Sequence, residues 1–151
     1  MDFGRLQDLR EDNDLTQKEL GNILGCSNHA ISVWETEKEI IPLRKLNMYA
    51  NYFHVSLDYL VKLSNDKTTN NILELDKVLI GHRIETLRKQ HKITQRELAR
   101  ILNTTNSTIW AYEKGKNLIL TAFAYQICKY FNVSMDYLCG REKKSISVVK
   151  N

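Results

Sequence analysis

A similar block of 21 residues occurs twice in this chain, and no other feature constrains the fold as strongly. Residues 15–35 read LTQKELGNILGCSNHAISVWE, and residues 93–113 read ITQRELARILNTTNSTIWAYE, 78 positions later. Without any gap, residues 5–63 and 83–141 share 21 identical pairs among 59. Two copies are too few for a solenoid, so the repeat predicts two tandem domains.

The repeat divides the 151-residue chain into two copies with a joint between them and a tail after them. We assign a first domain to 1–63, a linker to 64–71, a second domain to 72–142 and a tail to 143–151. The linker, SNDKTTNN, has no apolar residue to bury, so we expect it to be flexible. Within the tail, SISVV is a candidate strand. Domains of about sixty residues can fold alone, although their cores are thin.

Apolar residues at spacings of three and four predict that both copies are helical. Thr16 and Glu19 have the spacing of a capping box, which predicts a helix over 16–24. Gly25 follows, where a tight turn can use a positive φ angle. Ser27 is then a suitable N-cap for a third helix. The second copy repeats these features with Thr94, Glu97, Asn103 and Thr105.

The order of these blocks resembles the Xre, or Cro and lambda-repressor-like, helix-turn-helix family. The blocks are TQxEL, LGxS, an isoleucine and a Trp-Glu pair in the first copy, and their counterparts in the second. NYFHVSLDYL and KYFNVSMDYLCG resemble the last two helices of that five-helix domain. The resemblance covers nearly all of 4–62 and 81–141. It implies an all-α fold of two tandem five-helix lambda-repressor-like DNA-binding domains joined by a short polar linker.

The resemblance also implies a partly buried ion pair that ties the first helix to the third. Arg10 with Glu35, and Arg88 with Glu113, stand at the matching positions. We interpret these four residues as structural rather than as DNA contacts. Removing one member of such a pair would leave an uncompensated buried charge, which is costly.

In a helix-turn-helix the second helix of the motif lies in the major groove and reads base edges. Ile109 and Tyr112 should face the core, which leaves the other residues of that helix facing outward. The residues predicted to contact bases are Asn106, Ser107, Trp110 and Ala111 in the second copy and Asn28, His29, Ser32 and Val33 in the first. Asparagine pairs with adenine, and serine with either kind of base. For Trp110, a thymine methyl, a sugar or a protein contact are all open, and for the polar residues simple solvation is the alternative.

Phosphate contacts position such a domain and make its affinity depend on salt. The predicted phosphate contacts are Gln95, Thr105, Lys114 and Lys116 in the second copy and Gln17, Ser27 and Lys38 in the first. The family resemblance places the two glutamines at the DNA backbone, where a helix N-terminus also favours an anion. For the lysines, an ordinary solvated surface charge is the alternative.

The two copies carry opposite charge. Residues 1–63 contain seven Lys/Arg and ten Asp/Glu, a net charge of −3, whereas residues 72–151 contain fourteen and seven, a net charge of +7. Glu37 stands where the second copy has Gly115, and Glu39 follows; both carboxylates would repel nearby phosphate. We therefore expect the first copy to bind DNA weakly, to depend on tethering by the second, or to serve in dimerisation.

These patterns favour a sequence-specific DNA-binding transcriptional regulator, a repressor of the bacterial or phage type, with double-stranded DNA as its partner. One chain would read two different half-sites, and a homodimer on a longer site is an open alternative. The second interpretation is an antitoxin-like or antirepressor module that binds a protein partner through its acidic first domain. The acidic charge of that domain is its main support.

Motifs for catalysis or cofactor binding are missing from the sequence. It has no nucleophile motif, no glycine-rich phosphate loop and no ligand spacing among its histidines, so we expect no enzyme, no cofactor and no metal. The three cysteines lack CxxC spacing, which argues against disulfides and zinc. The absence of an eighteen-residue apolar run or a secretion signal predicts a cytoplasmic, nucleoid-associated protein with no membrane partner.

Overall fold

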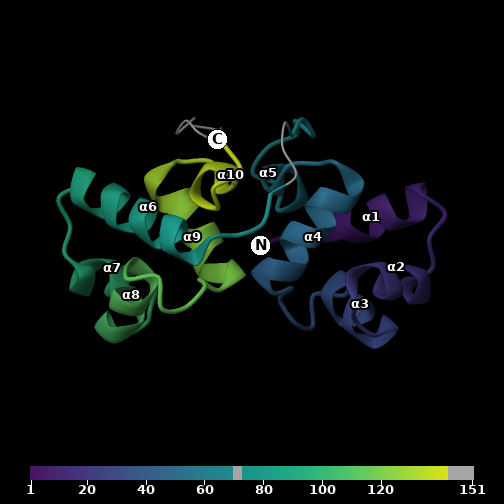
Figure 1. Cartoon of the computed structure of the whole chain (residues 1–151), viewed down its shortest axis with the longest axis horizontal. Coiled ribbons are helices and arrows are strands. Elements are labelled where there is room, and N and C mark those ends of the chain that lie inside the picture. Colours follow the sequence, from purple (N-terminus) through teal and green to yellow (C-terminus); the bar gives the residue numbers. More distant parts are fainter. Residues whose placement is uncertain (70–72, 143–151) are drawn as a thin grey trace. The chain divides into compact units, whose positions relative to one another are not determined.

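The computed structural model of the chain describes residues 1–69 and 73–142, which form two compact units of five helices each (Figure 1). The first unit contains α1 Gly4–Asp12, α2 Gln17–Leu24, α3 Asn28–Glu35, α4 Leu43–Phe53 and α5 Leu57–Leu60. The second contains α6 Lys77–Gln90, α7 Gln95–Ile101, α8 Asn106–Glu113, α9 Thr121–Phe131 and α10 Met135–Leu138. The described residues include no strand, and the predicted all-helical fold with two five-helix domains in tandem is confirmed.

The helices of the helix-turn-helix motif begin at the predicted caps. Ser27 Oγ accepts a hydrogen bond from Ala30 N at 3.1 Å at the start of α3. At the start of α7, Thr94 and Glu97 form the full capping box, because Glu97 Oε2 also accepts from Thr94 N at 3.1 Å. In the first unit, Thr16 Oγ1 accepts a hydrogen bond from the backbone N of Glu19 at 3.0 Å. The same hydroxyl donates to Glu19 Oε1 at 3.0 Å. No bond from the Glu19 carboxylate to the Thr16 backbone N–H is recorded there.

Both units turn the backbone into the left-handed region at the same places. The five matching pairs with positive φ are Asp14 and Lys92, Gly25 and Asn103, Glu37 and Gly115, His54 and Asn132, and Lys62 and Gly140. Gly25 has a φ of 68° and Asn103 a φ of 56°, as predicted for the turn inside the motif. Glycine and asparagine tolerate this conformation at least cost. The repeat in sequence is therefore a repeat in backbone geometry.

The two helices of each motif pack on one another through apolar residues at the predicted spacing. Leu20 on α2 and Ile31 on α3 are almost fully buried, and Leu98 on α7 and Ile109 on α8 match them. Packing of this apolar stripe fixes which face of α3 and of α8 is turned outward. The outward faces of these two helices are the candidate interface.

The first helix of the second unit is longer than its counterpart. α6 has 14 residues and α1 has nine, and α6 packs closely against α8. A Cβ atom added to Gly81 would lie 2.1 Å from the carbonyl oxygen of Tyr112, so only glycine allows this crossing. The matching residue of the first unit is Phe3, which precedes α1 and is buried.

Part of the predicted linker is held against the first unit. Arg5 Nη1 donates to Ser64 O at 2.7 Å, and the backbone N of Ser56 donates to Lys67 O at 3.1 Å. The prediction was a flexible linker that starts at residue 64. The structure differs, because Arg5 and Ser56 donate hydrogen bonds to carbonyl groups of this segment. The connection is therefore bound to the first unit as far as Lys67.

Some predicted features lie outside the residues that the structure describes. Residues 70 and 71 of the linker, the tail over 143–151 and the candidate strand SISVV lie outside them. Within residues 1–69 and 73–142, none of the three cysteines forms a disulfide, and no group of His, Cys, Asp or Glu could hold a metal ion. None of the helices in these ranges is long and apolar enough to cross a membrane.

Candidate nucleic-acid interface

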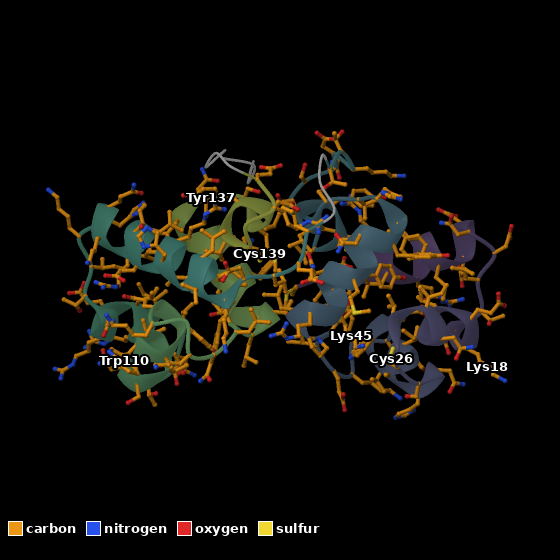
Figure 2. The ribbon with its side chains drawn as sticks, viewed as in Figure 1. Lys18, Cys26, Lys45, Trp110, Tyr137 and Cys139 are labelled. Carbon is orange, nitrogen blue, oxygen red and sulfur yellow. The ribbon has the colours of Figure 1, made fainter. Side chains whose placement is uncertain are left out.

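The outward face of α8 carries the residues predicted to contact bases. Asn106 and Ser107 are exposed in its first turn, and Trp110 follows one turn later with 45% of its surface exposed (Figure 2). Ala111 is half-buried. Ile109 and Tyr112, on the opposite side, are buried as expected. The predicted residues of the second domain therefore lie on one outward arc of the helix, with Ala111 at its edge.

The outward face of α3 is less prominent. Asn28 and His29 are exposed in its first turn, whereas Ser32 and Val33 are half-buried. Asn28 and Asn106 are the same residue type at the same helical position. The first domain can therefore present two exposed polar groups to a groove, and it has no counterpart to the exposed indole of Trp110.

The predicted ion pairs join the first helix of each unit to the end of its third helix. Arg88 Nε lies 2.7 Å from Glu113 Oε2, and Arg88 Nη2 donates to Glu113 Oε1 at 2.9 Å. In the first domain, Arg10 Nε lies 2.7 Å from Glu35 Oε2. Both pairs are nearly buried, with only 1% and 2% of the glutamate side chains exposed. Hydrogen bonds to the glutamates raise the pKa of Arg10 and of Arg88.

The same glutamates position the two glutamines predicted to contact phosphate. Gln95 Nε2 donates to Glu113 Oε1 at 3.1 Å, and Gln17 Nε2 donates to Glu35 Oε1 at 3.1 Å. Each glutamine is the first residue of its helix, where backbone N–H groups lack partners within the helix. The bond fixes one amide N–H toward the protein and leaves the half-buried side chain beside an anion-favouring helix end.

The remaining predicted phosphate contacts are exposed. Thr105 and Ser27 are the N-caps of α8 and α3. The lysines follow the ends of these helices: Lys38 after α3, and Lys114 and Lys116 after α8. None of these five positions is taken into the core, so all of them stay open to a ligand at the surface.

The loop between Lys114 and Lys116 is shaped by the long first helix of the second domain. Gly115, between the two lysines, is buried with a φ of 67°. A Cβ added there would lie 2.9 Å from the Cα of Val78 on α6. Lys77 Nζ also reaches the carbonyl oxygen of Lys116 at 3.4 Å. The first turn of α6 therefore packs against this loop and flanks it with another cation.

Glu37, at the matching position in the first domain, has a different role. Its φ is 60°, and its Oε1 accepts a hydrogen bond from the backbone N of Phe3 at 2.7 Å. The carboxylate is thus directed to the start of α1, a contact across 34 residues that the sequence did not reveal. The negative charge of Glu37 nevertheless stays beside the end of α3, and the exposed Glu39 adds a second negative charge.

Three exposed cations of the second domain were not among the predicted contacts. Lys92 precedes the motif, and Arg96 and Arg100 lie on α7, one turn apart. Their spacing is that of an ordinary solvated helix face. Comparison with the first copy could have found Lys92 and Arg100, because Asp14 and Asn22 stand at their positions, whereas Arg96 matches another cation, Lys18.

The exposed charges of the two motifs therefore differ in sign. Residues 92–117 expose five cations and one carboxylate, a net charge of +4. Residues 14–39 expose two cations and four carboxylates, a net charge of −2. Two motifs with the same backbone geometry thus present a basic and an acidic surface.

Comparison with known proteins gives matches to each half of the chain. A helix-turn-helix domain family matches residues 4–66, and a second helix-turn-helix family matches residues 84–138. Antitoxin PezA of Streptococcus pneumoniae is 38% identical over 65 residues, which are 43% of this chain and 41% of that protein. An uncharacterized HTH-type transcriptional regulator, YobD of Bacillus subtilis, is 34% identical over 62 residues, 41% of this chain and 55% of that protein.

The chain thus covers only about half of these relatives or less, and no solved structure matches it. The two family matches fall on the two five-helix units and include α2–α3 and α7–α8, the helix pairs whose geometry is described above. Together with the repeated caps, turns and ion pairs, they show that this chain carries two helix-turn-helix domains of the Xre-like type in tandem.

Proposed function

We propose that this protein is a sequence-specific DNA-binding transcriptional regulator in which the second domain supplies most of the affinity. The observation that carries this proposal is the net charge of +4 exposed on residues 92–117, against −2 on residues 14–39. Phosphate contacts from Lys and Arg dominate the affinity of such proteins for DNA. The printed description of YobD as an HTH-type transcriptional regulator supports the same class of function.

In the proposed complex, α8 lies in the major groove with its N-terminal turn at the base edges. Asn106 would pair with an adenine and Ser107 with a neighbouring base. Gln95 and Thr105 would contact the phosphates at the helix N-termini. The exposed cations Lys92, Arg96, Arg100, Lys114 and Lys116 would line the flanking DNA backbone.

The first domain would read a second, different half-site with Asn28 and His29. Its carboxylates oppose phosphate, so it would add specificity and little affinity of its own. Tethering to a bound second domain raises its effective concentration to about the millimolar range, which makes a weak half useful. A homodimer on a longer site is the alternative arrangement, and its stoichiometry on DNA would differ by a factor of two.

We propose that the protein represses transcription, because occupying an operator requires no contact with the transcription machinery.

The test of sequence-specific DNA binding is selection from a random pool of double-stranded DNA by the intact chain. Two variants serve as matched partners: Asn106→Ala with Ser107→Ala, and Asn28→Ala with His29→Ala. We expect a two-part motif whose stronger part disappears with the first variant and whose weaker part disappears with the second. If the intact chain enriches no DNA sequence at moderate salt, the proposal is wrong.

A second candidate is a protein that binds a partner protein through its first domain, in the manner of an antitoxin. The relative described as antitoxin PezA and the acidic surface of residues 14–39 favour it. Such a partner should present a basic surface. Reversing the charge with Glu37→Lys and Glu39→Lys should then abolish capture of the partner, whereas under the DNA-binding function the same change should strengthen DNA binding.

A further inference from the structure

Trp110 is exposed without a structural reason within its own domain. Tryptophan is usually well buried, yet 45% of this residue is exposed on the outward face of α8. Ile109 and Tyr112 already close the core beneath the helix. In the first domain Ser32 stands at the same position, and α3 is eight residues long, as α8 is. The fold therefore does not need an indole at this position.

The indole lies where the second domain would meet bases. Residues three and four apart share a helix face, so Trp110 shares its face with Asn106 and Ser107. A major groove that receives this face would place the ring one helical turn beyond those two side chains. Among the base edges in that groove, the one prominent apolar group is the 5-methyl group of thymine.

We propose that Trp110 reads the 5-methyl group of a thymine in the half-site of the second domain. This inference rests on the proposed DNA-binding function. The indole offers a broad, rigid apolar surface that loses little conformational freedom on contact. Ser32 offers no such surface, so the first domain has no matching preference. Trp110 thereby makes the two half-sites different in composition as well as in strength.

The test is a double-mutant cycle between protein and DNA, made with the intact chain on the duplex that it selects. Each thymine is replaced in turn by deoxyuridine, which removes only the methyl group. Trp110→Ser introduces the residue that the first domain has at this position. We expect deoxyuridine at one thymine to weaken binding of the unmodified protein about fourfold, the effect of exposing one methyl group. With Trp110→Ser, the same replacement should change nothing.

Two controls separate this inference from the proposed function. Trp110→Phe keeps an apolar ring and should retain part of the sensitivity to deoxyuridine, and Ser32→Ala should leave unchanged the deoxyuridine effect at the thymine that Trp110 reads. Because Trp110 is exposed, Trp110→Ser should unfold at nearly the same temperature as the unmodified chain. If the effects of Trp110→Ser and of deoxyuridine simply multiply at every thymine, Trp110 does not read the methyl group, although DNA binding stands. If the chain selects no DNA, both proposals fall together.

Discussion

The two domains are built on the same backbone but present opposite surfaces. Left-handed turns, N-caps and the Arg–Glu pair recur at matching positions, while the exposed charge of the motif changes from −2 to +4. The shared features are those that a helix-turn-helix needs in order to fold. The differing features lie on the exposed surface of the motif, where we propose that DNA binds. An internal repeat thus separates residues kept for folding from residues free to specialise.

The second difference is in how each domain holds its first helix. In the second domain, α6 extends past Gly81 and packs on the loop at Gly115. In the first domain, α1 begins at Gly4, and the carboxylate of Glu37 accepts a hydrogen bond from the backbone N of Phe3 instead. The residue that adds negative charge near the interface therefore also stabilises the start of a helix.

The largest expected effect comes from breaking the ion pair that both domains share. Glu113→Ala should destabilise the second domain by about 3–5 kcal/mol, because Arg88 would keep a nearly buried charge without a partner. Glu35→Ala should do the same to the first domain. Denaturant unfolding in a Trp110→Phe background measures this, because the buried Trp34 is then the one remaining tryptophan and reports on the first domain, while helix content reports on the whole chain.

If the two domains are independent, Glu113→Ala leaves the Trp34 transition in place and Glu35→Ala lowers it. Equal shifts in both variants would show that the domains unfold as one. A control for charge burial is the double replacement Arg88→Met with Glu113→Leu, which removes both charges and should cost far less than Glu113→Ala.

The next effect distinguishes the two ways of holding the first helix. Gly81→Ala should destabilise the second domain by about 1–3 kcal/mol, because its Cβ meets backbone carbonyl oxygens that cannot easily move. Gly4→Ala is the control, since its nearest neighbour is the flexible side chain of Asp2 at 3.2 Å. Thermal unfolding of both variants would check this. A similar loss in the two would mean that the helix crossing is not the cause.

The sequence predicted the fold because the folding signals are local. Thr16, Ser27 and Asn103 act within a few residues of their own positions, so a cap or a turn can be read directly. The bond from Phe3 to Glu37 joins residues 34 apart, and Gly81 meets a carbonyl on another helix. Contacts of that kind depend on packing, which no local pattern encodes.

The exposed positions of the candidate interface could be predicted in part for the same reason, while their contacts with DNA stay predictions. Asn106 and Ser107 follow from the helical period, which places them opposite Ile109 and Tyr112. Arg96 and Arg100 were missed because their spacing also fits an ordinary solvated face. The held segment after residue 63 was missed because polar composition alone does not show that Arg5 binds its carbonyl groups.

A smaller effect compares the two asparagines at the start of the recognition helices. Asn106→Ala should weaken binding to the selected DNA by about 1–3 kcal/mol and relax the preference at one base position. Asn28→Ala should relax a different position and weaken binding less, because the acidic first domain contributes less affinity. Titration of the selected duplex and of its single-base variants would measure both. Equal losses would show that the first domain binds as strongly as the second.

The smallest effect compares two identical lysines in opposite surroundings. Lys116 lies in a basic loop flanked by Lys77, so we expect it to neutralise a phosphate, and Lys116→Ala should reduce the slope of log affinity against log salt by about one unit. Lys38 lies between Glu37 and Glu39, which already balance its charge, so Lys38→Ala should leave the slope nearly unchanged. Affinity measured across a salt series for both variants decides between them. If Lys38→Ala lowers the slope as much as Lys116→Ala does, the carboxylates do not keep the first domain from the phosphates, and the surface charge does not explain the difference between the domains.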